Sequence, residues 1–126
     1  MTVHLKTRIT AVGPDVADLA DGGVLILFAD GAPPELAEVS VLHQPEIGPA
    51  EQEPTVGTPI TLGNASSVIT AMGPIAWNKV VEIGHVVINF NDGATAERPG
   101  EICAASIDLD VLKQALAVGS TIMIGA

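Results

Sequence analysis

The sequence predicts an all-β, mainly antiparallel domain, built as a small barrel or sandwich of about eight short strands with one or two short helices. Three observations point to it. Short aliphatic runs recur along the whole chain, and glycine and proline turns separate them at close spacing. The alternation of strands with helices is also too weak for a doubly wound fold. With 126 residues, the chain can bury a proper core and is expected to form a single domain over residues 1–126.

Apolar residues that alternate or adjoin over short runs predict the strands. The clearest run is residues 2–12, where Leu5 and Ile9 share one face and charged side chains share the other. Residues 24–28 are apolar throughout, which indicates a strand buried on both faces. In order, the predicted strands are residues 2–12, 24–28, 39–43, 59–62, 67–72, 84–90, 102–107 and 121–124.

Glycine and proline break the chain between these strands, and helical turns fit some of the gaps. The clearest helix is residues 108–117, where leucines recur at helical spacing, Asp108 suits the first turn and Gly119 suits the end. Weaker helical turns are predicted at residues 15–20, 35–38 and 77–82. The turn at residues 63–66 is predicted to be longer than the two-residue hairpin type.

The composition excludes several classes of partner. The formal net charge is −10, from 15 acidic and 5 basic side chains, which opposes binding to nucleic acid or to an anionic membrane surface and favours a soluble protein with basic or neutral partners. Aromatic residues are too few for base stacking. The one cysteine, Cys103, is predicted to be a small core residue, because it lies in an apolar segment and has no second cysteine to pair with. No signal peptide or membrane span is visible, so a cytoplasmic location is expected.

The main candidate for chemistry is His43, at the end of the strand predicted over residues 39–43. Residues 44–55, which follow it, are polar and rich in proline, and they predict a mobile surface loop. We therefore expect the imidazole ring to face this loop, where it can meet another molecule. Its neutral form has a lone pair that can attack phosphorus. A half-buried, hydrogen-bonded structural histidine is the alternative, and from the residues alone it is the more ordinary role.

Other kinds of site have little support. The chain has no glycine-rich phosphate loop, no cysteine pair and no nucleophile elbow. A metal site would need His43, His85 and Cys103, or a carboxylate, to converge, and their spacing does not suggest this. No metal or organic cofactor is therefore expected. No arginine or lysine lies close in sequence to either histidine.

Several stretches together resemble one family over nearly the whole chain. No single stretch is a strong motif, but their order and spacing are fairly specific. They are residues 1–3 with 7–13, residues 28–33, the Leu42–His43 position, residues 70–73, and residues 82–94 with Pro99–Gly100. In these stretches the chain resembles the glucitol/sorbitol-specific IIA component of the phosphoenolpyruvate-dependent sugar phosphotransferase system.

The resemblance implies a phosphocarrier. Such a protein accepts a phosphoryl group from the carrier protein HPr on its own histidine, and His43 matches that position. It then passes the group to the IIB unit of a IIB/IIC membrane sugar transporter, so it meets the membrane only through its partners. We add the hypothesis that His85 lies near His43 and donates a hydrogen bond to the phosphoryl oxygens. A strand histidine bonded to a neighbouring carbonyl is the alternative for His85. Charge stabilisation of the phosphoryl group would otherwise come from backbone N–H groups, for instance around Gly31 or Gly84, or from hydroxyls such as Ser40. An open strand edge would also allow a homodimer.

One departure from the family keeps an alternative open. The family typically has a second histidine and a glycine just after the active histidine, and here those places hold Gln44, Pro45 and Glu46. The alternative is a non-catalytic binding module on the same β fold that has lost phosphotransfer. The burial of His43 separates the two hypotheses, since a fully enclosed ring bonded at both nitrogens would favour the module.

Overall fold

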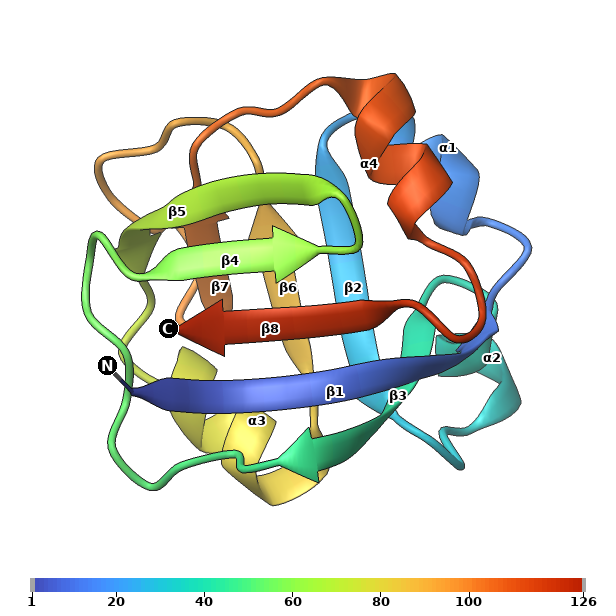
Figure 1. Ribbon diagram of the computed structural model, residues 1–126, viewed down its shortest axis with the longest axis horizontal. Coiled ribbons are helices and arrows are strands. Elements are labelled where there is room, and N and C mark those ends of the chain that lie inside the picture. Colours follow the sequence, from blue (N-terminus) through green and yellow to red (C-terminus); the bar gives the residue numbers. More distant parts are fainter. Residues whose placement is uncertain (1, 126) are drawn as a thin grey trace.

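The strands of this protein close into a barrel, which confirms the predicted all-β class. The computed structural model describes residues 2–125. Around the barrel the strand order is β1-β3-β2-β6-β7-β5-β4-β8, and β8 returns to pair with β1 (Figure 1). The strands are β1 (Val3–Val12), β2 (Val24–Ala29), β3 (Val41–Ile47), β4 (Pro59–Leu62), β5 (Ala65–Met72), β6 (Val86–Asn89), β7 (Glu101–Ala104) and β8 (Thr121–Gly125).

The ring is mainly antiparallel, as predicted. Only the β2–β3 and β6–β7 pairs run parallel among the pairings of residues 2–125. The ring is closed, but residues Gln44 to Ile47 pair with β1 alone, because the pairing of β2 with β3 ends at His43. A homodimer through an open strand edge stays a prediction.

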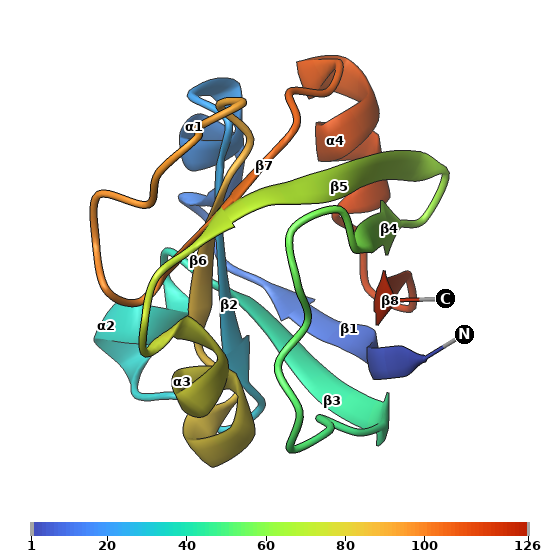
Figure 2. The same ribbon diagram turned by 90° about the vertical axis from the view of Figure 1, so that its left-hand side faces the viewer.

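Four short helices cover the ends of the barrel, where one or two were expected. They are α1 (Val16–Asp21), α2 (Pro34–Ala37), α3 (Ala76–Ile83) and α4 (Leu109–Ala115). Helices α1 and α4 lie together at one end, and α3 lies at the other (Figure 2). A 2.7 Å ion pair between Lys113 and Asp21 joins the first two. Asp108, which was predicted to lie in the first turn, lies just before α4 and caps it by accepting bonds from two backbone N–H groups.

The interior of the barrel is aliphatic because alternate residues of each strand point inward. On β1, Leu5 and Ile9 are buried as predicted, and Thr7 between them is fully buried as well. On β2, Leu25 and Leu27 are buried while their neighbours are partly exposed. The prediction that this strand is buried on both faces was therefore wrong, because its outer face is only partly covered.

The largest correction concerns β3. The strand begins at Val41 and continues through the exposed residues Gln44 to Ile47, which were predicted to be the start of a loop. These residues pair with β1, with Gln44 opposite Arg8 and Ile47 opposite Lys6. Pairing with a neighbouring strand, rather than apolar periodicity, extends β3, so the loop after it begins only at Gly48.

Two turns also differ from expectation. Leu62 pairs with Ala65, so the hairpin between β4 and β5 has only the two turn residues Gly63 and Asn64. Strand β6 begins at Val86 rather than at Gly84, because Gly84 ends α3 in a left-handed conformation with φ of 65°. No helix within residues 2–125 is long and apolar enough to cross a membrane.

Candidate functional site

His43 points into the barrel. It is two residues from Val41 on β3, and the period of two residues in a strand places both side chains on the inner face. Val41 belongs to the hydrophobic core, and only 1% of the surface of His43 is exposed. The prediction that this ring faces a mobile loop was therefore wrong. The residues after it continue the strand, and the ring lies under α3 instead.

Both ring nitrogens of His43 have a hydrogen-bond partner. Nε2 lies 2.8 Å from the carbonyl oxygen of Gly84, and Nδ1 lies 2.7 Å from the hydroxyl oxygen of Thr7. A carbonyl can only accept, so Nε2 carries a proton and donates it to Gly84. In the neutral ring Nδ1 then has the lone pair and accepts from the Thr7 hydroxyl.

The environment keeps this ring neutral. Burial lowers the pKa of His43 below its usual 6.5, because the charged ring loses its water, and the bond to the Gly84 carbonyl opposes this effect only in part. The neutral form of imidazole is the nucleophilic one. Near neutral pH the site therefore holds an uncharged histidine with one defined tautomer.

Gly84 allows the end of α3 to come close enough to contact the ring of His43. Gly84 lies against β2, where a Cβ atom on it would come 2.9 Å from the Cβ of Ala29. Ala29 pairs with His43 across the β2–β3 ladder. The end of α3 can thus approach the sheet closely enough to place a backbone carbonyl over the ring, in a left-handed conformation that glycine tolerates best.

His85 follows Gly84 directly, but its ring is engaged elsewhere. Its Nδ1 lies 3.2 Å from the carbonyl oxygen of Leu27 and donates to it, and its ring lies against Phe28 with a centroid distance of 5.2 Å. This is the contact of a histidine bonded to a neighbouring carbonyl. In the neutral ring the proton is on Nδ1, so Nε2 of His85 can donate to another molecule only when the ring is protonated.

Cys103 is fully buried, as predicted, but in a polar setting. Its thiol donates to Oε1 of the buried Glu101 at 3.3 Å, and Gly93 lies over its sulfur. Burial, the bond to Glu101 and the charge of Glu101 together raise the pKa of the thiol to about 11. His43, His85 and Cys103 thus have separate partners. Within residues 2–125 no group of three His, Cys, Asp or Glu side chains is placed to hold a metal ion.

The sequence analysis missed Thr7 as a partner of His43, and around Gly84 it expected backbone N–H groups where the structure places a carbonyl against the ring. Thr7 and Gly84 lie 36 and 41 residues away from His43 in the chain. A signal for Thr7 was nevertheless present, since it is a polar residue on the apolar face of a clearly alternating strand. Arg8 on β1 pairs with Gln44, the neighbour of His43 in the chain, but Arg8 and Gln44 are exposed whereas the ring of His43 is buried.

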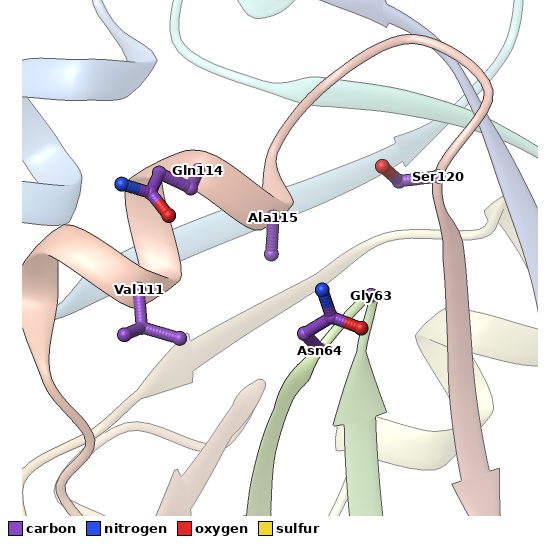
Figure 3. Close-up of a pocket in the computed structure, with 6 residues that line it drawn as sticks. All are labelled: Gly63, Asn64, Val111, Gln114, Ala115 and Ser120. Carbon is purple, nitrogen blue, oxygen red and sulfur yellow. The ribbon is translucent and has the colours of Figure 1, made fainter.

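One hollow on the surface lies at the other end of the barrel. It has a volume of about 150 Å³ and is lined by α4 and the turn between β4 and β5. Figure 3 shows the amides of Asn64 and Gln114 and the hydroxyl of Ser120 around it. Neither His43 nor His85 lines it.

A family model and two relatives point to the same family. The sequence profile described as "PTS system glucitol/sorbitol-specific IIA component" matches residues 4–125. Proteins named "PTS system glucitol/sorbitol-specific EIIA component" from Shigella flexneri and Escherichia coli (strain K12) are each 33% identical over 105 residues, which cover 83% of this chain and 84% of theirs.

A solved structure has the same fold. The crystal structure of a PTS system IIA component from Enterococcus faecalis V583 superimposes with a TM-score of 0.75 over 96% of this chain and 99% of that one, at 20% identity. At that identity the likeness concerns the fold alone. The profile match and the two relatives cover most of the sequence, and the chain therefore belongs to the glucitol/sorbitol-specific IIA component family of the phosphotransferase system.

Proposed function

We propose that this protein is a phosphocarrier that accepts a phosphoryl group from the histidine of HPr on His43 and passes it to the IIB unit of a glucitol/sorbitol-like sugar transporter. The family supports a phosphotransferase role in general. The observation that carries the proposal is the state of His43, a neutral histidine with a lowered pKa and a defined tautomer in a chain of that family.

The chemistry needs only this imidazole. A ring nitrogen with a lone pair attacks the phosphorus of the donor, a new N–P bond forms, and the N–P bond of the donor breaks. The product is a high-energy phosphoramidate, so the group can be passed on. A ring that is 1% exposed cannot touch a histidine of another protein, and transfer therefore requires a local opening that uncovers it.

The partners follow from the same proposal. The net charge of −10 steers a partner with a basic docking face and makes the encounter depend on salt. Such a carrier works in the cytoplasm between HPr and the IIB/IIC transporter, and meets the membrane only through that transporter. The sugar is proposed from the names of the relatives.

His85 has a narrower role in this proposal than the sequence alone suggested. Its ring would donate to a phosphoryl oxygen from Nε2 only as an imidazolium, because Nδ1 is already bonded to Leu27.

The second candidate is the binding module, and one observation favours it. The ring of His43 is enclosed and bonded at both nitrogens, which is the arrangement of a structural histidine. In this case Thr7, His43 and Gly84 tie α3 to the barrel and carry no phosphoryl group.

A phosphotransfer assay separates the two candidates. Wild type, His43→Gln, His85→Gln and His4→Gln are each incubated with HPr, its upstream kinase and labelled phosphoenolpyruvate, and then with the IIB unit. The phosphocarrier predicts an acid-labile label on wild type and on His4→Gln, the control for a histidine outside the site, that is chased onto IIB. It predicts no label on His43→Gln. A wild-type protein that stays unlabelled beside an active IIA control protein would favour the module.

A further inference from the structure

Residues 48–53, between β3 and β4, run beside α3 and are tied to the start of β1 (Figure 2). The backbone N–H of Ala50 donates to the carbonyl oxygen of His4 at 2.8 Å, and Nδ1 of the His4 ring donates to the carbonyl oxygen of Gln52 at 3.1 Å. Gly48 packs against the same carbonyl of His4, since a Cβ atom on it would overlap that oxygen. Three contacts with one residue of β1 thus fix the path of this segment.

The segment holds α3 through Trp77. Nε1 of Trp77 donates to the carbonyl oxygen of Ala50 at 2.7 Å, and the ring of His4 lies edge-on to the indole with a centroid distance of 6.1 Å. Trp77 is only 2% exposed and belongs to the hydrophobic core, as do the other two buried residues of α3, Ala76 and Val80. One indole ring therefore joins α3 both to the core and to residues 48–53.

Helix α3 is the part of the cover over His43 that can leave without opening the barrel. Strands β1 and β2 flank β3 at His43 and are joined to it by ladder hydrogen bonds. The helix takes no part in these ladders, and Gly84 at its end covers the ring with one carbonyl group. Because only three of its eight residues are buried, α3 can open locally at a lower cost than unfolding of the barrel.

We propose that residues 48–53 form a strap that keeps α3 closed over His43 and releases it when a basic protein surface binds the strap. This surface belongs to the phosphoryl donor, so docking of the donor and exposure of the ring are coupled. The inference rests on the phosphocarrier function proposed above, which requires the buried ring to be uncovered.

The charge of the strap identifies the kind of partner. Glu51 and Glu53 are exposed, and residues 44–58 contain no lysine or arginine. Such a segment attracts a surface rich in lysine and arginine, whereas a second copy of this chain, with a net charge of −10, would be repelled. Ala50 is the neighbour of Glu51, so a partner that displaces the strap also removes the carbonyl to which Trp77 donates.

Trp77→Phe tests the strap in the free protein. It keeps an aromatic ring in the core and removes the bond to Ala50, so we expect amide hydrogen exchange in α3 to become about threefold to tenfold faster. Phosphorylation of His43 by phospho-HPr should become faster by a similar factor, whereas the loss of a merely structural bond would not raise it. Ser67→Ala is the matched control, because it removes a side-chain bond to the carbonyl of Ala105 on another part of the barrel, and it should change neither rate.

Unchanged exchange in a folded Trp77→Phe protein would refute the strap, and faster exchange without faster phosphorylation would refute the role of α3 as the cover. The wild type gives a second test, because Trp77 is its one tryptophan. We expect its fluorescence to shift to the red when an HPr variant that lacks the reactive histidine is bound to saturation. No shift would overturn the inference, while a wild type that still becomes phosphorylated keeps the phosphocarrier function. A wild type that takes no label would overturn both.

Two double variants test the charge of the strap. Glu51→Gln with Glu53→Gln removes two charges, and we expect phosphorylation by phospho-HPr to slow by about tenfold at low salt and the difference to shrink at high salt. Asp15→Asn with Asp18→Asn removes the same charge from exposed positions at the α1 end of the barrel and should stay within about twofold of wild type. Equal slowing in both double variants would show that net charge, and not the strap, attracts the donor.

Discussion

Two side chains in this protein lose contact with water on burial, and their pKa values shift in opposite directions. Inside the barrel, burial lowers the pKa of His43 and leaves a neutral ring with a lone pair. On the outer face of β7, burial and Glu101 raise the pKa of Cys103 to about 11 and leave a neutral thiol. Neutral imidazole is a nucleophile, whereas a neutral thiol is not. The same physical cause thus makes the histidine a candidate for chemistry and the cysteine inert.

The largest expected effect is on thiol reactivity. A rise in pKa from 9.0 to about 11 lowers the thiolate fraction of Cys103 near neutral pH by about a hundredfold, and the overlying chain adds a steric barrier. We expect a disulfide reagent to react at least about a hundred times more slowly with the native protein than with the protein unfolded in urea. Equal reaction rates in the native and the unfolded protein would contradict an inert, buried Cys103 thiol.

A substitution at Glu101 tests the cause of the raised pKa of Cys103. Glu101→Gln keeps an oxygen that can accept the S–H bond but removes the negative charge, so the pKa of Cys103 should fall. We expect the native thiol to react about three to ten times faster with the same reagent. Glu97→Gln is the matched control, because Glu97 acts on Cys103 only through a weaker charge effect. A larger gain from Glu97→Gln than from Glu101→Gln would contradict this assignment.

Acid should destabilise the protein through His43. The pKa of His43 is below 6.5 in the folded state, so the unfolded chain binds more protons as the pH falls from about 6.5 towards the lowered value. The free energy of unfolding should therefore decrease in this window, by at most about 1.4 kcal/mol per pH unit from this one group. Urea unfolding at several pH values measures it, and His43→Gln should have a shallower slope than wild type. Identical slopes would mean that the ring titrates normally.

Alkali should also destabilise the protein, through Cys103. Its pKa is raised in the folded state, so the unfolded chain loses its proton first as the pH rises from about 9 towards about 11. The free energy of unfolding should fall in this window, and Cys103→Ala should remove that part of the decrease. The slope from this one group is again at most about 1.4 kcal/mol per pH unit. A Cys103→Ala protein with an unchanged alkaline slope would speak against a raised thiol pKa.

Much of the fold could be predicted because it depends on local patterns. The alternation of β1 identified its buried face, including Thr7, and leucine spacing with Asp108 located α4. Position 43 was also selected from the sequence, since an apolar strand ends in a histidine there. Its role as the phosphoryl acceptor stays a prediction.

The rest depends on contacts between distant parts of the chain. Gln44 to Ile47 have no apolar pattern, and they are a strand only because β1 pairs with them. Because of this pairing, the residues that follow His43 are part of a barrel strand instead of the expected loop. The contact with Gly84 exists because the end of α3 packs closely against Ala29, and no pattern within either segment encodes such an approach.

The closure of the barrel sets when the protein can finish folding. Strand β8 lies between β1 and β4 and is the last strand of the ring in chain order. During synthesis β1 leaves the ribosome before β8, and until β8 follows, the backbone N–H and C=O groups of β1 on that side have no strand to pair with. A nascent chain that stops before Thr121 has two open sheet edges, which makes it a target for chaperones or for aggregation until β8 has emerged.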